Sequence, residues 1–121
     1  MRTFVIALIL AGLSLHSGLV HAEATASQVL KTYQAASDDG KTYLRGYMIG
    51  LVTAYGYANV TLKAREADLL YCVPKDTDLV DEDVVGLMRY SIREDAKLGR
   101  SPFGMALLLA LNRRFPCRAQ K

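Results

Sequence analysis

Histidine and tryptophan are almost absent from this chain of 121 residues. It has no tryptophan, and its two histidines, His16 and His21, lie in an N-terminal segment that we expect to be removed. Imidazole is the commonest metal ligand and a frequent general base, because its pKa lies near neutral pH. The sequence therefore predicts a protein that is not an enzyme, with no catalytic residue, metal site or cofactor.

Cysteine is scarce as well. There are only two: Cys72 lies two residues before Pro74, and Cys117 directly follows Pro116. A metal site would need further good ligands, and a free reactive thiol is the other alternative. We expect a disulfide, because the N-terminal segment indicates export to an oxidising compartment. In the chain-entropy model, closing a loop of this length stabilises a fold by roughly 4 kcal/mol.

Residues 1–22 have the features of a secretory signal peptide. A short basic start precedes an apolar run from Phe4 to Leu13, and a Val-x-Ala triplet ends at Ala22. Small residues at these positions are read by signal peptidase, so we expect cleavage after Ala22, with Ala24 and Ala26 as alternatives. An uncleaved membrane anchor is less favoured, because the apolar run is shorter than the ~20 residues that span a bilayer.

The remaining residues, 23–121, have the length of one small domain. Arg2 is the only charged residue of the leader, so its removal lowers the formal net charge from +3 to +2. A charge this small gives no reason to expect nucleic acid or another polyanion as a partner.

The spacing of apolar residues predicts four helices. They are 27–36 with Ser27 as N-cap, about 41–63 preceded by Asp38 and Asp39, about 78–98 opened by Thr77 or Asp78 and stopped by Gly99, and about 102–114 with Ser101 as N-cap. Leu69 to Val73, which Pro74 ends, is expected to be extended. The connections are short and no hairpin is evident, so we predict an all-α compact bundle of about four helices with one disulfide.

The helix predicted over 41–63 is apolar around most of its circumference, so we expect it to be central. It carries Gly46 and Gly50 four residues apart. Glycine costs about 1 kcal/mol in a helix interior relative to alanine, so we expect another helix to approach closely there. A membrane helix pair would show the same spacing, but Thr53 and Asn59 interrupt the apolar stretch, and we expect no membrane span in the mature chain.

Two of these helices carry candidate binding faces. Tyr43, Tyr47, Tyr55 and Tyr57 lie on the second, where they either form a recognition surface or pack in the core with their hydroxyls reaching water. The stretch from Met105 to Leu111 is apolar all round. Its helix is therefore either enclosed by its neighbours or exposes a face to a partner.

Acidic residues gather in segment 75–83 without completing a known site. Asp76 and Asp78 match the first two ligands of a calcium loop, but the third oxygen ligand and the turn glycine are missing. We therefore expect a helix start with acids in its first turn. Neighbouring carboxylates such as Glu94 and Asp95 point in different directions on a helix, so we expect a solvated surface rather than an acid/base pair.

Several short motifs follow one another in a characteristic order. They are Gly46-Tyr47-Met48-Ile49-Gly50 on a helix, Tyr71-Cys72-Val73-Pro74, Thr77 opening a helix, and an Ala/Leu-rich helix that ends in Phe115-Pro116-Cys117. From about Tyr43 to Cys117, this order resembles the Rap/Tai family of secreted immunity proteins. The residues that carry the resemblance are Gly46, Tyr47, Gly50, Pro74 and Pro116.

The resemblance implies a small periplasmic helical protein, often dimeric, that protects against toxins of the type VI secretion system. Family members neutralise a peptidoglycan-cleaving amidase by occluding its active site through protein contact, without catalysis. The family's disulfide maps onto Cys72 and Cys117. A second bridge of other members is absent, because Leu44 or Arg45 stands where they have cysteine, and no toxin-contacting residue carries over. A periplasmic stress chaperone or envelope-maintenance protein is the alternative.

Overall fold

The computed structural model describes residues 23–117, apart from the side chains of residues 81 and 82, so the predicted signal peptide lies outside the described residues. Within this part, the chain forms five helices and no strand. They are α2 (Ala26–Ala35), α3 (Asp38–Ala64), α4 (Asp81–Glu94), α5 (Ala96–Arg100) and α6 (Phe103–Arg114). The predicted all-α fold is confirmed, and the helix predicted over 78–98 is in fact two helices.

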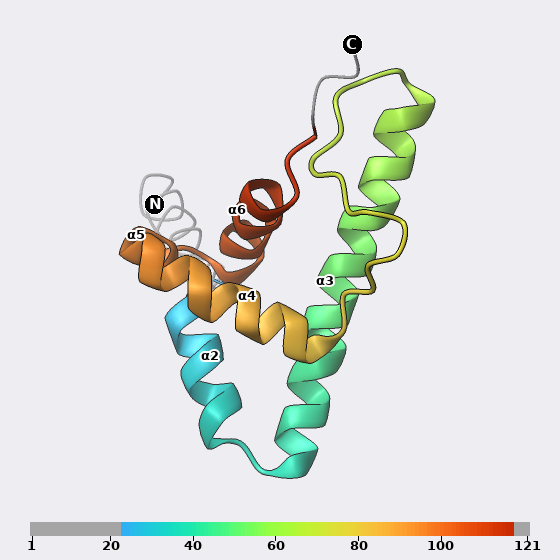
Figure 1. Ribbon diagram of the computed structural model, residues 1–121. Coiled ribbons are helices and arrows are strands. Elements are labelled where there is room, and N and C mark those ends of the chain that lie inside the picture. The colour runs from blue at the N-terminus through green and yellow to red at the C-terminus, as the bar shows by residue number, and fades with distance from the viewer. Residues whose placement is uncertain (1–22, 118–121) are drawn as a thin grey trace, which may run out of the picture.

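The helices pack around α6. In Figure 1, α2 and α3 form a V that is closed at their connection, and α4 crosses it. Helix α6 contacts both α2 and α4. Its residues Phe103, Ala106, Leu107 and Leu111 are fully buried. Helix α6 is therefore apolar all round because its neighbours enclose it, except along a narrow exposed strip.

The expectation that α3 is the central helix is wrong. Met48 is its only fully buried residue. The helix has 27 residues, against 14 in α4 and 12 in α6, so it extends well beyond the elements that cover it. Many of its uncharged residues are glycine, alanine or tyrosine, which expose less apolar surface than leucine or carry a polar hydroxyl.

The first two helices begin earlier than predicted. Thr25, not Ser27, caps α2: its hydroxyl accepts the N–H of Gln28 at 3.3 Å, and the Gln28 side chain accepts the N–H of Thr25 at 2.9 Å. This reciprocal pair is a capping box. Ser37 caps α3 by accepting the N–H of Gly40 at 3.3 Å, so Asp38 and Asp39 form its first turn instead of preceding it.

The start of α4 was also predicted incorrectly. Val80 occupies the N-cap position, in place of Thr77 or Asp78, and half of its side chain is exposed. The carboxylate of Asp83 accepts the N–H of Val80 at 3.4 Å. Val84 and Met88, four residues apart on one side of the helix, are buried.

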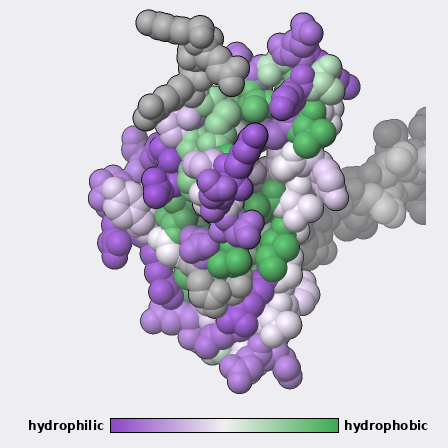
Figure 2. Space-filling model, turned by 45° about the vertical axis from the view of Figure 1, so that its right-hand side comes forward, coloured by the Kyte–Doolittle hydropathy of each residue, from purple (hydrophilic) through white to green (hydrophobic). Residues whose placement is uncertain are grey.

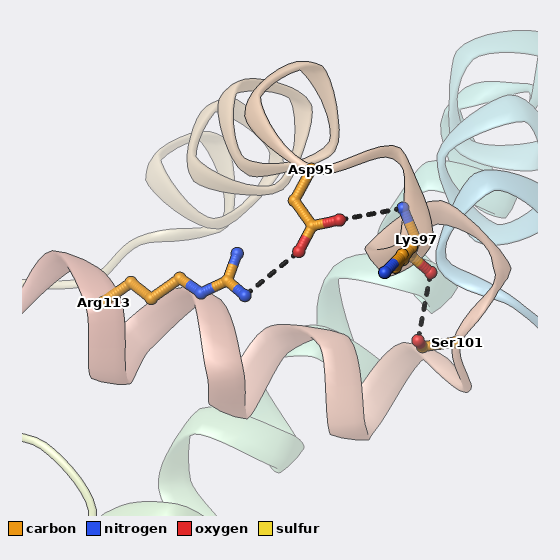
Figure 3. Close-up of polar contacts among 4 residues, drawn as sticks. All are labelled: Asp95, Lys97, Ser101 and Arg113. Carbon is orange, nitrogen blue, oxygen red and sulfur yellow. Dashed lines mark hydrogen bonds and ion pairs between the residues drawn. The ribbon is translucent and has the colours of Figure 1, made fainter.

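Helix α4 ends at Glu94 because Asp95 has an extended backbone, with φ −142° and ψ 95°. The Asp95 carboxylate then caps α5 by accepting the N–H of Lys97 at 3.1 Å (Figure 3). Gly99 is therefore not the stop but a residue of α5, where a Cβ atom would lie 2.5 Å from the Ser27 hydroxyl of α2. The absence of a side chain lets these two helices approach closely.

The start of α6 lies one residue later than predicted. Ser101 is not its N-cap but closes α5, with its hydroxyl donating to the Lys97 carbonyl at 3.2 Å (Figure 3). Pro102 takes the N-cap position and makes no side-chain capping bond.

The disulfide between Cys72 and Cys117 is present, with a Cα–Cα distance of 4.9 Å, and links residues 45 positions apart. It ties the end of α6 to the segment that follows α3, which is non-helical between residues 67 and 74. Asn59 holds this segment to α3: its amide oxygen accepts the N–H of Leu70 at 2.7 Å, and its amide nitrogen donates to the Tyr71 carbonyl at 2.9 Å. This clamp was not apparent from the sequence.

Candidate functional site

The acidic residues of the described part are dispersed. No three side chains of His, Cys, Asp or Glu lie close enough together within it to hold a metal ion. Asp95 faces Arg113 of α6, with 3.0 Å between carboxylate oxygen and guanidinium nitrogen (Figure 3). The hydrogen bond from Arg113 lowers the pKa of Asp95, and the backbone N–H of Lys97 lowers it further. Asp95 thus joins α5 to α6.

The tyrosines of α3 divide between two environments. Tyr47 donates a hydrogen bond to the Glu23 carboxylate at 2.6 Å, and Tyr55 donates to the Gly104 carbonyl at 2.7 Å. Burial raises the pKa of both hydroxyls, and for Tyr47 the bond to Glu23 raises it further. Both therefore remain protonated donors. Tyr43 and Tyr57, in contrast, are 79% and 71% exposed.

The exposed side of α3 forms an uncharged surface that we name the α3 open face. Its residues, all exposed, are Tyr43, Gly46, Ile49, Gly50, Thr53, Ala54, Tyr57 and Val60. No charged residue occurs between Arg45 and Lys63. A surface helix usually presents charged or polar residues to water, so an uncharged face of this length is unusual.

The glycines of this face have no neighbour within the described part of the chain. A Cβ atom built on Gly46 or Gly50 would meet no atom within 4 Å. The expected close approach of another helix is therefore not found within the described part of this chain. The cost of two glycines in a helix interior, about 1 kcal/mol each, is not offset by packing inside this domain.

A second surface lies beside α4, and we name it the α4 groove. It has a volume of about 590 Å³ and is lined by Thr77, Leu79, Asp83, Gly86, Leu87, Tyr90, Arg114 and Phe115. Its walls are mainly apolar, whereas Asp83 and Arg114 supply one charge of each sign. The Arg114 guanidinium lies 5.3 Å from the centre of the Phe115 ring, a cation–π distance.

Figure 2 turns the side that carries α3 toward the viewer. Several hydrophobic patches lie on this side, with hydrophilic residues between and around them.

The structure does not gather the family-motif residues in one site. Gly46 and Gly50 lie on the α3 open face, while Tyr47 points to Glu23 on the covered side of the helix. Pro74 and Pro116 are exposed near the disulfide. The motif residues therefore fall into two groups, one on α3 and one beside the disulfide.

Sequence reasoning missed the α4 groove. Neither Arg114 nor Tyr90 was identified as a candidate binding residue, although Tyr90 is 54% exposed. The available signal was Tyr90 itself, an aromatic residue between the polar residues Arg89 and Ser91. Large exposed aromatic residues are frequent in binding surfaces.

None of the described helices combines the length and the apolar character needed to cross a membrane. Comparison with protein-family models, with curated proteins and with solved structures gave no match. The resemblance to the Rap/Tai family therefore rests on the motifs of this sequence.

Proposed function

We propose that this protein acts by binding another protein in the periplasm. In its most specific form, the proposal is an immunity-type protein that neutralises a secreted peptidoglycan amidase by covering its active site. The order of the sequence motifs and the secretory leader support this form. The disulfide is consistent with an oxidising compartment.

The observation that carries the proposal is the α3 open face. Its two exposed tyrosine rings, at about 200 Å² each, offer about 300 Å² of accessible surface. Each partner of a standard protein interface buries about 800 Å². Ile49 and Val60, which are 49% and 67% exposed, extend the face, so it supplies a large part of what a stable interface needs.

The pattern of this face fits a second copy of the same chain. Tyr43, Gly46, Gly50, Ala54 and Tyr57 follow one another at intervals of three, four, four and three residues, the same in both directions. At 100° per residue they lie within a sector of about 80°. A two-fold axis at Gly50 would place Tyr43 of each copy against Tyr57 of the other, as a self-complementary interface requires.

Small residues in the middle of this pattern would let two antiparallel α3 helices approach closely. The distance between packed helices depends on the side chains at their contact, and glycine allows the shortest. A homodimer of this kind leaves the α4 groove available, because none of the residues that line it belongs to α3. We assign the α4 groove to the amidase.

Gly50 and Gly86 provide a matched test of the two surfaces. Each lies in a helix interior, and a Cβ atom on either would meet no atom within 4 Å. Arginine at either position should therefore be tolerated by the fold. We expect Gly50→Arg to be a monomer by light scattering, because it brings two like charges together at the axis, whereas Gly86→Arg remains a dimer and no longer inhibits the amidase.

The assay combines the exported, oxidised protein with secreted and periplasmic fractions of its source. Bound proteins are identified by mass spectrometry, and their activity is measured on purified peptidoglycan. A stoichiometric amidase that is inactive while bound supports the proposal. An unaltered molar mass in Gly50→Arg refutes the dimer, and capture of no cell-wall hydrolase refutes the immunity role.

One observation favours the alternative of a periplasmic chaperone. Met105 and Leu109 of α6 are 56% and 38% exposed, so an apolar strip remains on an otherwise enclosed helix. Chaperones bind unfolded clients through surfaces of this kind. If the protein is a chaperone, it will suppress aggregation of an unrelated protein in acid, and Met105→Ser with Leu109→Ser will weaken this effect. A dedicated inhibitor will have no such activity.

A further inference from the structure

We propose that the leader is cut after Ala22, and that Glu23, as the new N-terminal residue, caps α6 from the opposite end of the chain. The inference depends on export of the protein and not on the identity of its partner. Hydrolysis of the Ala22–Glu23 peptide bond consumes one water molecule, and it leaves a carboxylate on the leader and a free amino group on Glu23.

The start of α6 lacks a cap of its own. Pro102 stands at the N-cap position and makes no side-chain bond to the helix. The first N–H groups of a helix have no partner within it, so a cap must come from elsewhere. One oxygen of the Glu23 carboxylate accepts the Gly104 N–H at 2.7 Å and also the Tyr47 hydroxyl at 2.6 Å. Its negative charge suits the positive end of the helix dipole.

The absence of a side chain at residue 104 makes room for this carboxylate. A Cβ atom on Gly104 would lie 3.1 Å from the bound Glu23 oxygen and 3.0 Å from the Tyr55 hydroxyl. Either neighbour would have to move. The glycine, the two tyrosines and Glu23 therefore form one complementary arrangement around the start of α6.

The residues after Glu23 are also part of the folded domain. The Ala24 carbonyl accepts the N–H of Phe103 at 3.0 Å, and the N–H of Ala26 donates to the Ser101 carbonyl at 3.0 Å. Thr25 caps α2, and Ala26 is completely buried. The segment 23–26 thus pairs with the start of α6 along its whole length.

These contacts distinguish the three cleavage positions that the sequence allows. A cut after Ala24 would remove the acceptors of two α6 N–H groups. A cut after Ala26 would also remove the cap of α2 and a buried residue. Only a cut after Ala22 leaves every one of these contacts in the mature chain. Either later cut would leave backbone N–H groups without their acceptors, which is unfavourable inside a fold.

The first test is the intact mass of the protein recovered after export of the full-length chain. We expect a chain that begins at Glu23. A chain that begins at Thr25 or Ser27 would overturn the proposal.

The second test measures the capping role by urea unfolding of the exported protein. We expect Glu23→Ala to lower the midpoint by about 1 M and Glu23→Gln by less, because the amide retains an acceptor oxygen. Glu94→Ala, which removes an exposed carboxylate from the last turn of α4, is the control and should leave the midpoint unchanged. Equal midpoints for Glu23→Ala and the control would refute the cap. Neither test measures partner binding, so failure here is distinct from failure of the proposed function.

Discussion

Replacing a helix glycine by alanine should raise or lower the free energy of unfolding, depending on the space around that glycine. Gly50 lies in the interior of α3, and a Cβ atom there would meet no atom within 4 Å. Alanine is favoured over glycine in a helix interior by about 1 kcal/mol. Gly50→Ala should therefore raise the free energy of unfolding of the monomer by about that amount.

Gly99 should behave in the opposite way. A Cβ atom there would lie 2.5 Å from the Ser27 hydroxyl oxygen and 3.3 Å from a methyl group of Ile92. Both neighbours would have to shift, and overpacking of this kind costs roughly 1–3 kcal/mol. We expect Gly99→Ala to lower the free energy of unfolding, because this cost exceeds the gain in helix propensity.

A double variant tests the cause. Ser27→Ala removes the hydroxyl, and the nearest remaining atom of residue 27 lies 3.8 Å from the new Cβ, an ordinary contact. The double variant Ser27→Ala with Gly99→Ala should therefore recover most of the lost stability, giving a coupling of about 1 kcal/mol or more.

The assay is urea unfolding followed by circular dichroism, at protein concentrations low enough that dimerisation does not add to stability. A destabilised Gly50→Ala would refute the account of the α3 open face. A Gly99→Ala variant that is more stable than the parent, or a double variant without coupling, would refute the close approach of α2 and α5.

Three further predictions concern the covalent link, a polar clamp and the response to alkali. Replacing Cys72 and Cys117 by alanine should lower the free energy of unfolding by about 4 kcal/mol. If reduction of the disulfide in the parent protein left its urea midpoint unchanged, this prediction would be contradicted. Asn59→Ala should lower the free energy of unfolding by about 2 kcal/mol, because it leaves two backbone groups without partners. The exposed control Asn112→Ala loses one hydrogen bond and should lower it by less. Burial, and then the bond to Glu23, raise the pKa of Tyr47 above the ordinary value of 10.0, so unfolding releases protons and stability should fall as pH rises above 10. The Tyr47→Phe variant should lose less stability over that range. If the free energies of unfolding of the variant and the parent protein fall in parallel as pH rises, the assignment is refuted.

The elements that the sequence predicted best are those with a strong local signal. The unbroken apolar run of α6 predicted a helix, and Ala106, Leu107 and Leu111 within that run are buried. The disulfide followed from cysteine count and the leader. Each of these signals comes from residue types that are usually buried or bonded in folded proteins.

The errors arose where tertiary contacts decide the outcome. Gly99 was predicted to end a helix, but the nearby Ser27 explains it as a site of close approach. Asp95 divides one predicted helix into two, because its carboxylate caps α5 and pairs with Arg113 of α6. Contacts between residues that are distant in the sequence produce no periodic spacing that could predict them.

The candidate surfaces were predicted only in part. The sequence identified tyrosines and glycines on α3, but it placed this helix at the centre and predicted that another helix approaches its glycines. Exposure of Tyr43 and Tyr57 depends on how far α3 extends beyond α4 and α6. The α4 groove requires the end of α6 beside the start of α4, a juxtaposition that only the fold provides.

The most direct test of the account is capture of an amidase by the exported protein and its Gly50→Arg and Gly86→Arg variants, with activity measured on purified peptidoglycan. The account predicts that the parent protein and Gly50→Arg retain and inhibit one cell-wall amidase, whereas Gly86→Arg does not. Failure of the parent protein to retain any such enzyme, or equal inhibition by all three proteins, would contradict it.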